Sequence, residues 1–156
     1  MACAESELAR HPSYDVLVTG HSLGGALASY TAFDLATACP ATLVTAITFG
    51  APKPVNTKLR GAMGAIPNLR VYRVVNENDL MTTLPPRFAK IALFSHRHPG
   101  YLIWFSRGKV LAPRPWGSRN PWVELRPPSR ASLEGHKMHR YIESLEEYDG
   151  GPGFAC

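Results

Sequence analysis

The feature that most constrains the fold of this 156-residue chain is the segment Gly20–Gly24, which reads Gly-His-Ser-Leu-Gly. It follows an apolar segment, Tyr14–Thr19, that predicts a short strand, and it opens a long helical segment, Leu23–Ala38. A strand that turns directly into a helix needs a sharp backbone bend, and glycines at both ends of the pentapeptide permit one. The pattern predicts a tight turn that lifts the hydroxyl of Ser22 off a sheet.

The rest of the chain predicts alternating helices and strands. Helices are expected over residues 2–10, 23–38 and 57–65 and in a terminal segment, and strands over residues 14–19, 42–49, 69–75 and 101–105, with 109–111 pairing as a hairpin. Such alternation indicates the α/β class, with a mostly parallel sheet flanked by helices. Asp34 is the only charge in the helix Leu23–Ala38, so we expect most of its circumference to be buried.

Length and composition indicate one globular domain. Hydrophobic residues make up 45% of the chain and charged residues 19%, which excludes wholesale disorder. We expect a domain over residues 1–149 and a flexible tail over 150–156, where Gly-Gly-Pro-Gly follows the last helix.

No run approaches the roughly 18 apolar residues of a membrane span, so no transmembrane segment is expected. The segment Met1–Arg10 lacks the apolar region of a signal peptide, and the three cysteines match no zinc or redox motif.

The formal net charge is +5, and much of the excess lies between Arg107 and Arg130. A basic patch of this kind can meet nucleic acid or an anionic lipid surface. Because the segment is rich in proline and contains no nucleic-acid-binding motif, we favour a solvated loop and expect no nucleic-acid partner.

The context of Ser22 predicts a nucleophile. A serine at a strand-to-helix turn is exposed to substrate, and the backbone N–H of Leu23, at the start of the helix, can donate to an oxyanion. The elbow itself comprises Gly20, His21 and Gly24 around the serine. The alternatives are a glycine-rich phosphate loop and a turn without a chemical role.

A serine nucleophile needs a general base, and the base needs an orienting carboxylate. In enzymes with this type of turn, the acid and then the histidine follow the serine along the chain. This order excludes the aspartates that precede the serine, lie in its helix or lie in the tail, which are Asp15, Asp34 and Asp149. Asp79 remains, just beyond a predicted strand, at the sheet edge where sites form. Glu77 is the alternative acid, and the alternative role for Asp79 is that of a turn residue.

Four histidines follow Asp79. His136 directly precedes the terminal helix, whose apolar residues at helical spacing are Met138, Tyr141, Ile142 and Leu145. We expect His136 to be the base, and His139 to face solvent because it lies off that apolar face. His96 and His98 form an H-x-H pair that could bind zinc, but no third ligand is evident, so a structural or exposed role is favoured.

With these residues in place, the chain resembles the class 3 lipases, also called fungal-type triacylglycerol lipases. The segments that resemble the family's motifs are Val18–Ala28, Thr48–Pro52, Val74–Asp79, Leu84–Pro86, His98–Tyr101 and His136–Met138 with Tyr141. The resemblance implies an α/β-hydrolase fold and hydrolysis of carboxylic esters by Ser22, Asp79 and His136. It also implies a lipid ester substrate, met at a lipid–water interface, and no metal or organic cofactor.

The resemblance covers the C-terminal portion of that fold. Family members have several strands, a lid helix and a second oxyanion-hole donor before the nucleophile strand, where this chain has thirteen residues before Tyr14. The alternative function is therefore that of a weak or inactive lipase-like fragment that serves as an interaction or lipid-binding module.

Overall fold

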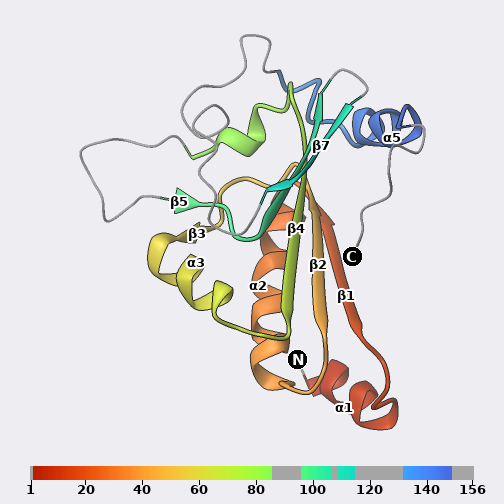
Figure 1. Cartoon of the computed structure of the whole chain (residues 1–156), viewed down its shortest axis with the longest axis vertical. Coiled ribbons are helices and arrows are strands. Elements are labelled where there is room, and N and C mark those ends of the chain that lie inside the picture. Colours follow the sequence, from red (N-terminus) through yellow and green to blue (C-terminus); the bar gives the residue numbers. More distant parts are fainter. Residues whose placement is uncertain (1, 86–95, 107–108, 115–131, 149–156) are drawn as a thin grey trace.

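The computed structural model describes residues 2–85, 96–106, 109–114 and 132–148, and its main feature is a five-stranded sheet (Figure 1). The strand order is β1-β2-β4-β6-β7. The strands are β1 (Val16–His21), β2 (Val44–Phe49), β4 (Leu69–Asn76), β6 (Tyr101–Ser106) and β7 (Lys109–Arg114). The first four run parallel, and β7 returns antiparallel to β6. This arrangement confirms the predicted α/β class, the mostly parallel sheet and the hairpin, whose second strand is longer than expected.

The described helices also match the predicted order. They are α1 (Ala2–Arg10), α2 (Leu23–Ala38), α3 (Thr57–Gly64) and α5 (Met138–Glu146), with a short 3-10 helix, η1, at Met81–Thr83. Figure 1 shows α2 along one face of the sheet and α5 beyond the carboxyl ends of the parallel strands. Among the described residues, no helix combines the length and apolar character required to cross a bilayer.

A second, two-stranded sheet was not expected. It pairs β3 (Val55–Asn56) antiparallel with β5 (His96–Arg97), in a region predicted to be a loop on the β3 side. The side-chain oxygen of Asn56 also accepts a hydrogen bond from the N–H of Leu59 at 2.8 Å, which caps α3. Strands this short depend on a tertiary pairing, which local sequence does not encode.

The main core lies between α2 and the sheet. The alternating pattern of β2 turns Val44 and Ala46 inward, where both are fully buried. Small residues on the facing side of α2, such as Ala32 and Ala36, belong to the same buried cluster. Their small side chains let the helix lie close to the strands, so the start of α2 is fixed relative to the ends of β1 and β2.

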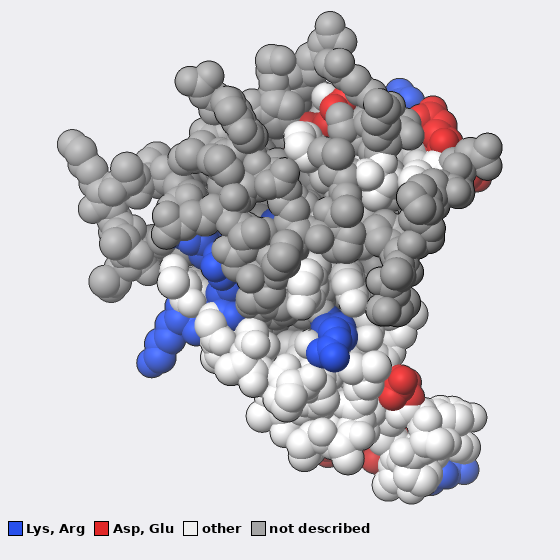
Figure 2. Space-filling view, viewed as in Figure 1, with Lys and Arg blue, Asp and Glu red and all other residues white. Residues whose placement is uncertain are grey.

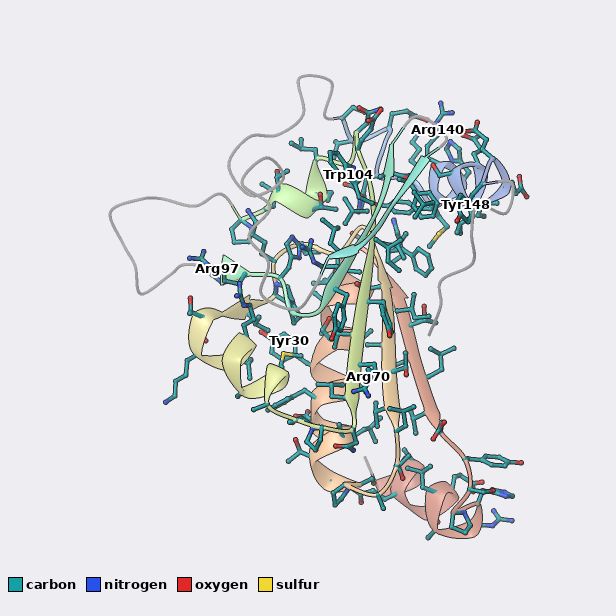
Figure 3. The ribbon with its side chains drawn as sticks, in the orientation of Figure 1. Tyr30, Arg70, Arg97, Trp104, Arg140 and Tyr148 are labelled. Carbon is teal, nitrogen blue, oxygen red and sulfur yellow. The ribbon has the colours of Figure 1, made fainter. Side chains whose placement is uncertain are left out.

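The expectation that most of α2 is buried was wrong. Leu23 and Leu27 are 66% and 58% exposed, on the side of the helix away from the sheet. The lack of charge along α2 does not bury it, because the sheet and the α3 region cover one side of the helix and leave its other side exposed. Tyr30, labelled in Figure 3, reaches from α2 toward α3, and its hydroxyl donates to the carbonyl of Pro54 at 2.5 Å.

β1 is the first strand in the order of the sheet, and one of its edges therefore faces no other described strand. Leu17, the second residue of β1, is 64% exposed. The hydroxyl of Thr19 donates to the carbonyl of Ile47 at 2.9 Å. An edge of this kind presents backbone N–H and C=O groups to its surroundings.

The terminal helix was predicted correctly, but its apolar face is buried at only one residue. Tyr141 is 1% exposed and packs with Val74 and Phe105, whereas the other apolar residues of that face are at least 40% exposed.

Figure 2 shows acidic side chains over α5 and basic ones over α3. The predicted tail at 150–156 and most of the basic segment at 107–130 lie outside the described residues.

Candidate active site

The candidate nucleophile, Ser22, lies at the turn between β1 and α2. Its backbone has φ 58° and ψ −127°, and it is the only non-glycine residue with positive φ in the described part of the chain. Such a conformation is costly and is typical of functional turns. Its N–H donates to the carbonyl of Phe49 at 2.9 Å, and its carbonyl accepts from the N–H of Gly25 at 3.0 Å. The residue therefore ends the strand pairing and begins the helix.

Two glycines give this turn its space. A Cβ on Gly20 would lie 2.3 Å from the carbonyl oxygen of Gly24, and one on Gly25 would lie 2.9 Å from the carbonyl oxygen of Gly20. By contrast, a Cβ on Gly24 would meet nothing within 4 Å. Glycines at both flanks were expected to permit the bend and a close backbone approach. The close approach occurs at Gly20 but not at Gly24, and the second one falls one residue later, at Gly25.

Leu23 is the first residue of α2. The first N–H groups of a helix have no acceptor within it, and they point out from its N-terminus. The N–H of Leu23 is one of these groups, at the residue that directly follows Ser22. The helix dipole also favours negative charge at this point.

The structure brings together the three side chains that the sequence singled out. Nε2 of His136 lies 2.8 Å from Oγ of Ser22, and Nδ1 of His136 lies 2.9 Å from Oδ2 and 3.0 Å from Oδ1 of Asp79. Because a carboxylate only accepts, Nδ1 carries the proton of a neutral imidazole and Nε2 accepts from the serine hydroxyl. This is the tautomer that a general base for Ser22 requires.

Asp79 is held in place by its own turn. It directly follows the loop after β4 and is 1% exposed. Its Oδ1 accepts the N–H of Met81 at 2.8 Å, and its Oδ2 accepts the hydroxyl of Tyr141 at 2.5 Å. These donors compensate a buried negative charge. The alternative acid, Glu77, lies earlier in this loop, and the carboxylate in contact with His136 is that of Asp79.

Backbone bonds hold the His136 loop beside the Asp79 loop. The N–H of Ser132 donates to the carbonyl of Asn78 at 2.9 Å, and residues 79 and 132 form an isolated parallel bridge. Gly135 fits against the same carbonyl, because a Cβ there would lie 2.5 Å from it. Two loops that are far apart in sequence therefore meet at one edge of the sheet.

Gly50 makes room for the acid and the base at the end of β2. Its φ is +59°, and an added Cβ would lie 2.5 Å from Oδ2 of Asp79, 3.0 Å from the hydroxyl of Tyr141 and 3.1 Å from Nδ1 of His136. Only glycine adopts this conformation without strain and leaves this space open.

The other histidines have different surroundings. His98 is buried, and its Nε2–H donates to the carbonyl of Thr82 at 2.8 Å. Burial, followed by the positive charge of Arg73, holds the pKa of His98 well below its usual value. His139 is exposed, as predicted, and pairs with Glu134 at 3.3 Å. No group of three or more potential metal ligands occurs among the residues that the structure describes.

Two residues of the site were not identified from the sequence as neighbours of the acid or base. Tyr141 was assigned to an apolar helix face, and His21 was assigned only to the elbow. The ring Nε2–H of His21 donates to the main-chain carbonyl of His136 at 2.7 Å. Two sequence signals could have identified them. Tyr141 places a hydroxyl on an otherwise aliphatic helix face, and His21 places an imidazole next to the candidate serine.

Comparisons with known proteins identify the family of the chain. A family model described as lipase (class 3) matches residues 2–89, which include Ser22 and Asp79. Phospholipase A1-II 5 from Oryza sativa subsp. indica is 36% identical over 151 residues, covering 92% of this chain and 29% of the relative.

Two solved structures share the fold. The Rhizomucor miehei lipase in its propeptide complex has a TM-score of 0.70 and 26% identity, covering 86% of this chain and 43% of that one. A triacylglycerol lipase, described as having a serine protease triad as its catalytic centre, has a TM-score of 0.60 and 32% identity over 69% of this chain and 39% of its own. This chain spans between 15% and 29% of the length of the curated relatives it matches. By its sequence match and its fold, it belongs to the class 3 lipase family.

Proposed function

We propose that this protein hydrolyses carboxylic esters of lipids, with Ser22 as nucleophile, His136 as general base and Asp79 as the orienting acid. The observation that best supports the proposal is the continuous set of contacts from Ser22 Oγ through the His136 ring to the Asp79 carboxylate. The Ser22 hydroxyl donates to Nε2 of His136, and Nδ1–H of His136 donates to Asp79. This order of donors and acceptors is the one that removal of the serine proton requires.

The proposed reaction has two acyl-transfer steps. In the first, Nε2 of His136 accepts the Ser22 proton as Oγ attacks the ester carbonyl, and Asp79 stabilises the imidazolium. The N–H of Leu23 donates to the oxyanion of the tetrahedral intermediate. The imidazolium then protonates the leaving alcohol, which departs and leaves an acyl-serine. Water, deprotonated by His136, attacks this ester and releases the carboxylic acid and free Ser22.

The proposed substrate class follows from the relatives. Their names include phospholipase A1 and triacylglycerol lipase, and both activities cleave a carboxylic ester between a fatty acid and glycerol. We propose a glycerolipid ester, of the triacylglycerol or monoacylglycerol kind, met at a lipid–water interface. The proposed chemistry uses protein groups alone, without a metal or an organic cofactor.

A second candidate function is that of an inactive lipase-like module that binds lipid or protein. It is favoured by the large apolar side chains that the described surface exposes, with Leu17, Leu23 and Leu27 all more than half exposed. Large exposed apolar side chains of this kind, where they form a contiguous patch, mark interaction surfaces.

Hydrolysis of p-nitrophenyl butyrate by the wild-type chain and by Ser22→Ala distinguishes the two. If the proposal is correct, the wild-type chain releases p-nitrophenol catalytically and the Ser22→Ala variant does not. Equal background rates from two folded proteins would contradict the proposed activity. Vesicle binding that persists in Ser22→Ala, without hydrolysis by either protein, would favour the binding module.

A further inference from the structure

We propose that Tyr141 is a positioning residue of this site, whose hydroxyl fixes the Asp79 carboxylate and so sets the orientation of the His136 ring. The catalytic consequence rests on the function proposed above, whereas the structural consequence does not.

The hydroxyl of Tyr141 has one donor and one acceptor role, and both are occupied. The N–H of Asn76 donates to it at 3.3 Å, so its own hydrogen remains for Oδ2 of Asp79 at 2.5 Å. Burial, followed by the negative charge of Asp79 and the hydrogen bond to it, raises the pKa of Tyr141. The hydroxyl therefore stays protonated and keeps donating throughout the neutral pH range.

Three groups contact the carboxylate of Asp79: the backbone N–H of Met81, the hydroxyl of Tyr141 and the ring of His136. Oδ1 accepts from Met81 N–H at 2.8 Å, Oδ2 accepts from Tyr141 at 2.5 Å, and Nδ1 of His136 faces both oxygens at 2.9–3.0 Å. Met81 and Tyr141 thus each hold a different oxygen of the carboxylate. Without the tyrosine hydroxyl, Met81 is the one donor other than His136 itself that these contacts leave to fix the rotation of the carboxylate, and Oδ2 loses a buried donor.

The ring of Tyr141 is held separately from its hydroxyl. It packs edge-on against His21, with centroids 5.9 Å apart, and against Phe49, with centroids 6.1 Å apart. Tyr141→Phe therefore removes the hydroxyl and retains these aromatic contacts. Tyr148, labelled beside α5 in Figure 3, is a matched control, because its ring packs edge-on against Phe105 at 6.4 Å.

The first test is the low-field proton resonance of His136 Nδ1–H, assigned by its loss in Asp79→Ala. The Tyr141 hydroxyl withdraws electron density from the carboxylate, so its removal makes Asp79 a stronger acceptor. We expect Tyr141→Phe to move the resonance further downfield and Tyr148→Phe to leave it unchanged. If Tyr141→Phe does not fold, 3-fluorotyrosine at position 141 keeps the ring and strengthens the donor. It should move the resonance in the opposite direction.

The second test is kinetic. After reactive sites have been counted with a p-nitrophenyl phosphonate, Tyr141→Phe should lower kcat by roughly ten- to a hundredfold at unchanged KM, as expected for a lost hydrogen bond to a charged group. A purely structural role would lower the number of reactive sites without changing kcat per site.

The two readouts separate this proposal from the proposed function. A wild-type chain without esterase activity contradicts the function, while a resonance shift specific to Tyr141 still supports the positioning role. An unchanged resonance in folded Tyr141→Phe, an equal shift in Tyr148→Phe, or a folded wild-type chain with no such resonance would overturn the proposal.

Discussion

The imidazole of His21 holds the backbone of His136, with its Nε2 2.7 Å from the main-chain oxygen and the two rings stacked at a centroid distance of 4.6 Å. His21 directly precedes the candidate nucleophile, and His136 is the candidate base. The contact therefore links the elbow to the C-terminal loop, so that serine and histidine keep their distance even though 114 positions separate them.

Replacing His21 with Phe should retain a stacked ring and lose the hydrogen bond to the carbonyl. We expect a loss of about 1 kcal/mol in the free energy of unfolding, which is typical of one such bond, and a lower kcat. Urea unfolding and ester hydrolysis measure the two effects. His139→Phe is the control, because that histidine is exposed. Equal effects of both substitutions would contradict the role assigned to His21.

Replacing Asp79 with Asn should leave the site almost unchanged in shape and abolish most activity. The amide can donate to Nδ1 of His136, which favours the tautomer that cannot accept the Ser22 proton, and in a serine protease triad this costs about 10⁴ in kcat. Steady-state kinetics of Asp79→Asn and Glu77→Gln test the assignment of the acid. A larger loss in Glu77→Gln would show that the wrong carboxylate had been assigned.

Gly50→Ala should destabilise the fold and slow the reaction. The new methyl group meets Oδ2 of Asp79 at 2.5 Å, in a backbone conformation with φ +59° that costs about 1 kcal/mol or more for alanine. Gly61→Ala offers the opposite expectation, a gain of about 0.5–1 kcal/mol, because Gly61 lies inside α3 with open space around it. Thermal unfolding of both variants checks the contrast, and a stabilised Gly50→Ala would contradict the described packing.

Burial of His98 should make stability depend on pH. Its pKa in the folded state lies well below the ordinary 6.5, so below about pH 6.5 the unfolded chain binds a proton that the folded chain does not. The stability associated with neutral His98 is therefore complete above that pH and is lost as the pH falls. His98→Gln, which does not titrate, should show a shallower decline in urea midpoint between about pH 7 and pH 5. Parallel pH profiles for the two proteins would contradict this expectation.

Local sequence was sufficient for much of the fold. The apolar strands, the small-residue helix α2 and the turn at Ser22 each have a short-range signature, and each lies where it was predicted. The order of serine, acid and histidine also selected the three side chains that the structure brings into contact.

Features that depend on contacts between distant segments were not predictable in this way. The burial of Tyr141 and its bond to Asp79 require the position of α5 relative to β4, which the helical spacing alone does not specify. The exposure of Leu23 and Leu27 depends on which layers cover α2, and composition alone predicted the opposite. The pairing of β3 with β5 likewise requires the tertiary fold.

The roles proposed for Ser22 and His136 are best tested by the site at which a p-nitrophenyl alkylphosphonate modifies the protein, determined by peptide mass spectrometry. We expect a single adduct on Ser22, formed with release of p-nitrophenol, and a much slower reaction in His136→Ala than in His139→Ala. An adduct on another residue, or labelling of Ser22 at the same rate in His136→Ala, would contradict the assignment of Ser22 and His136 as nucleophile and base.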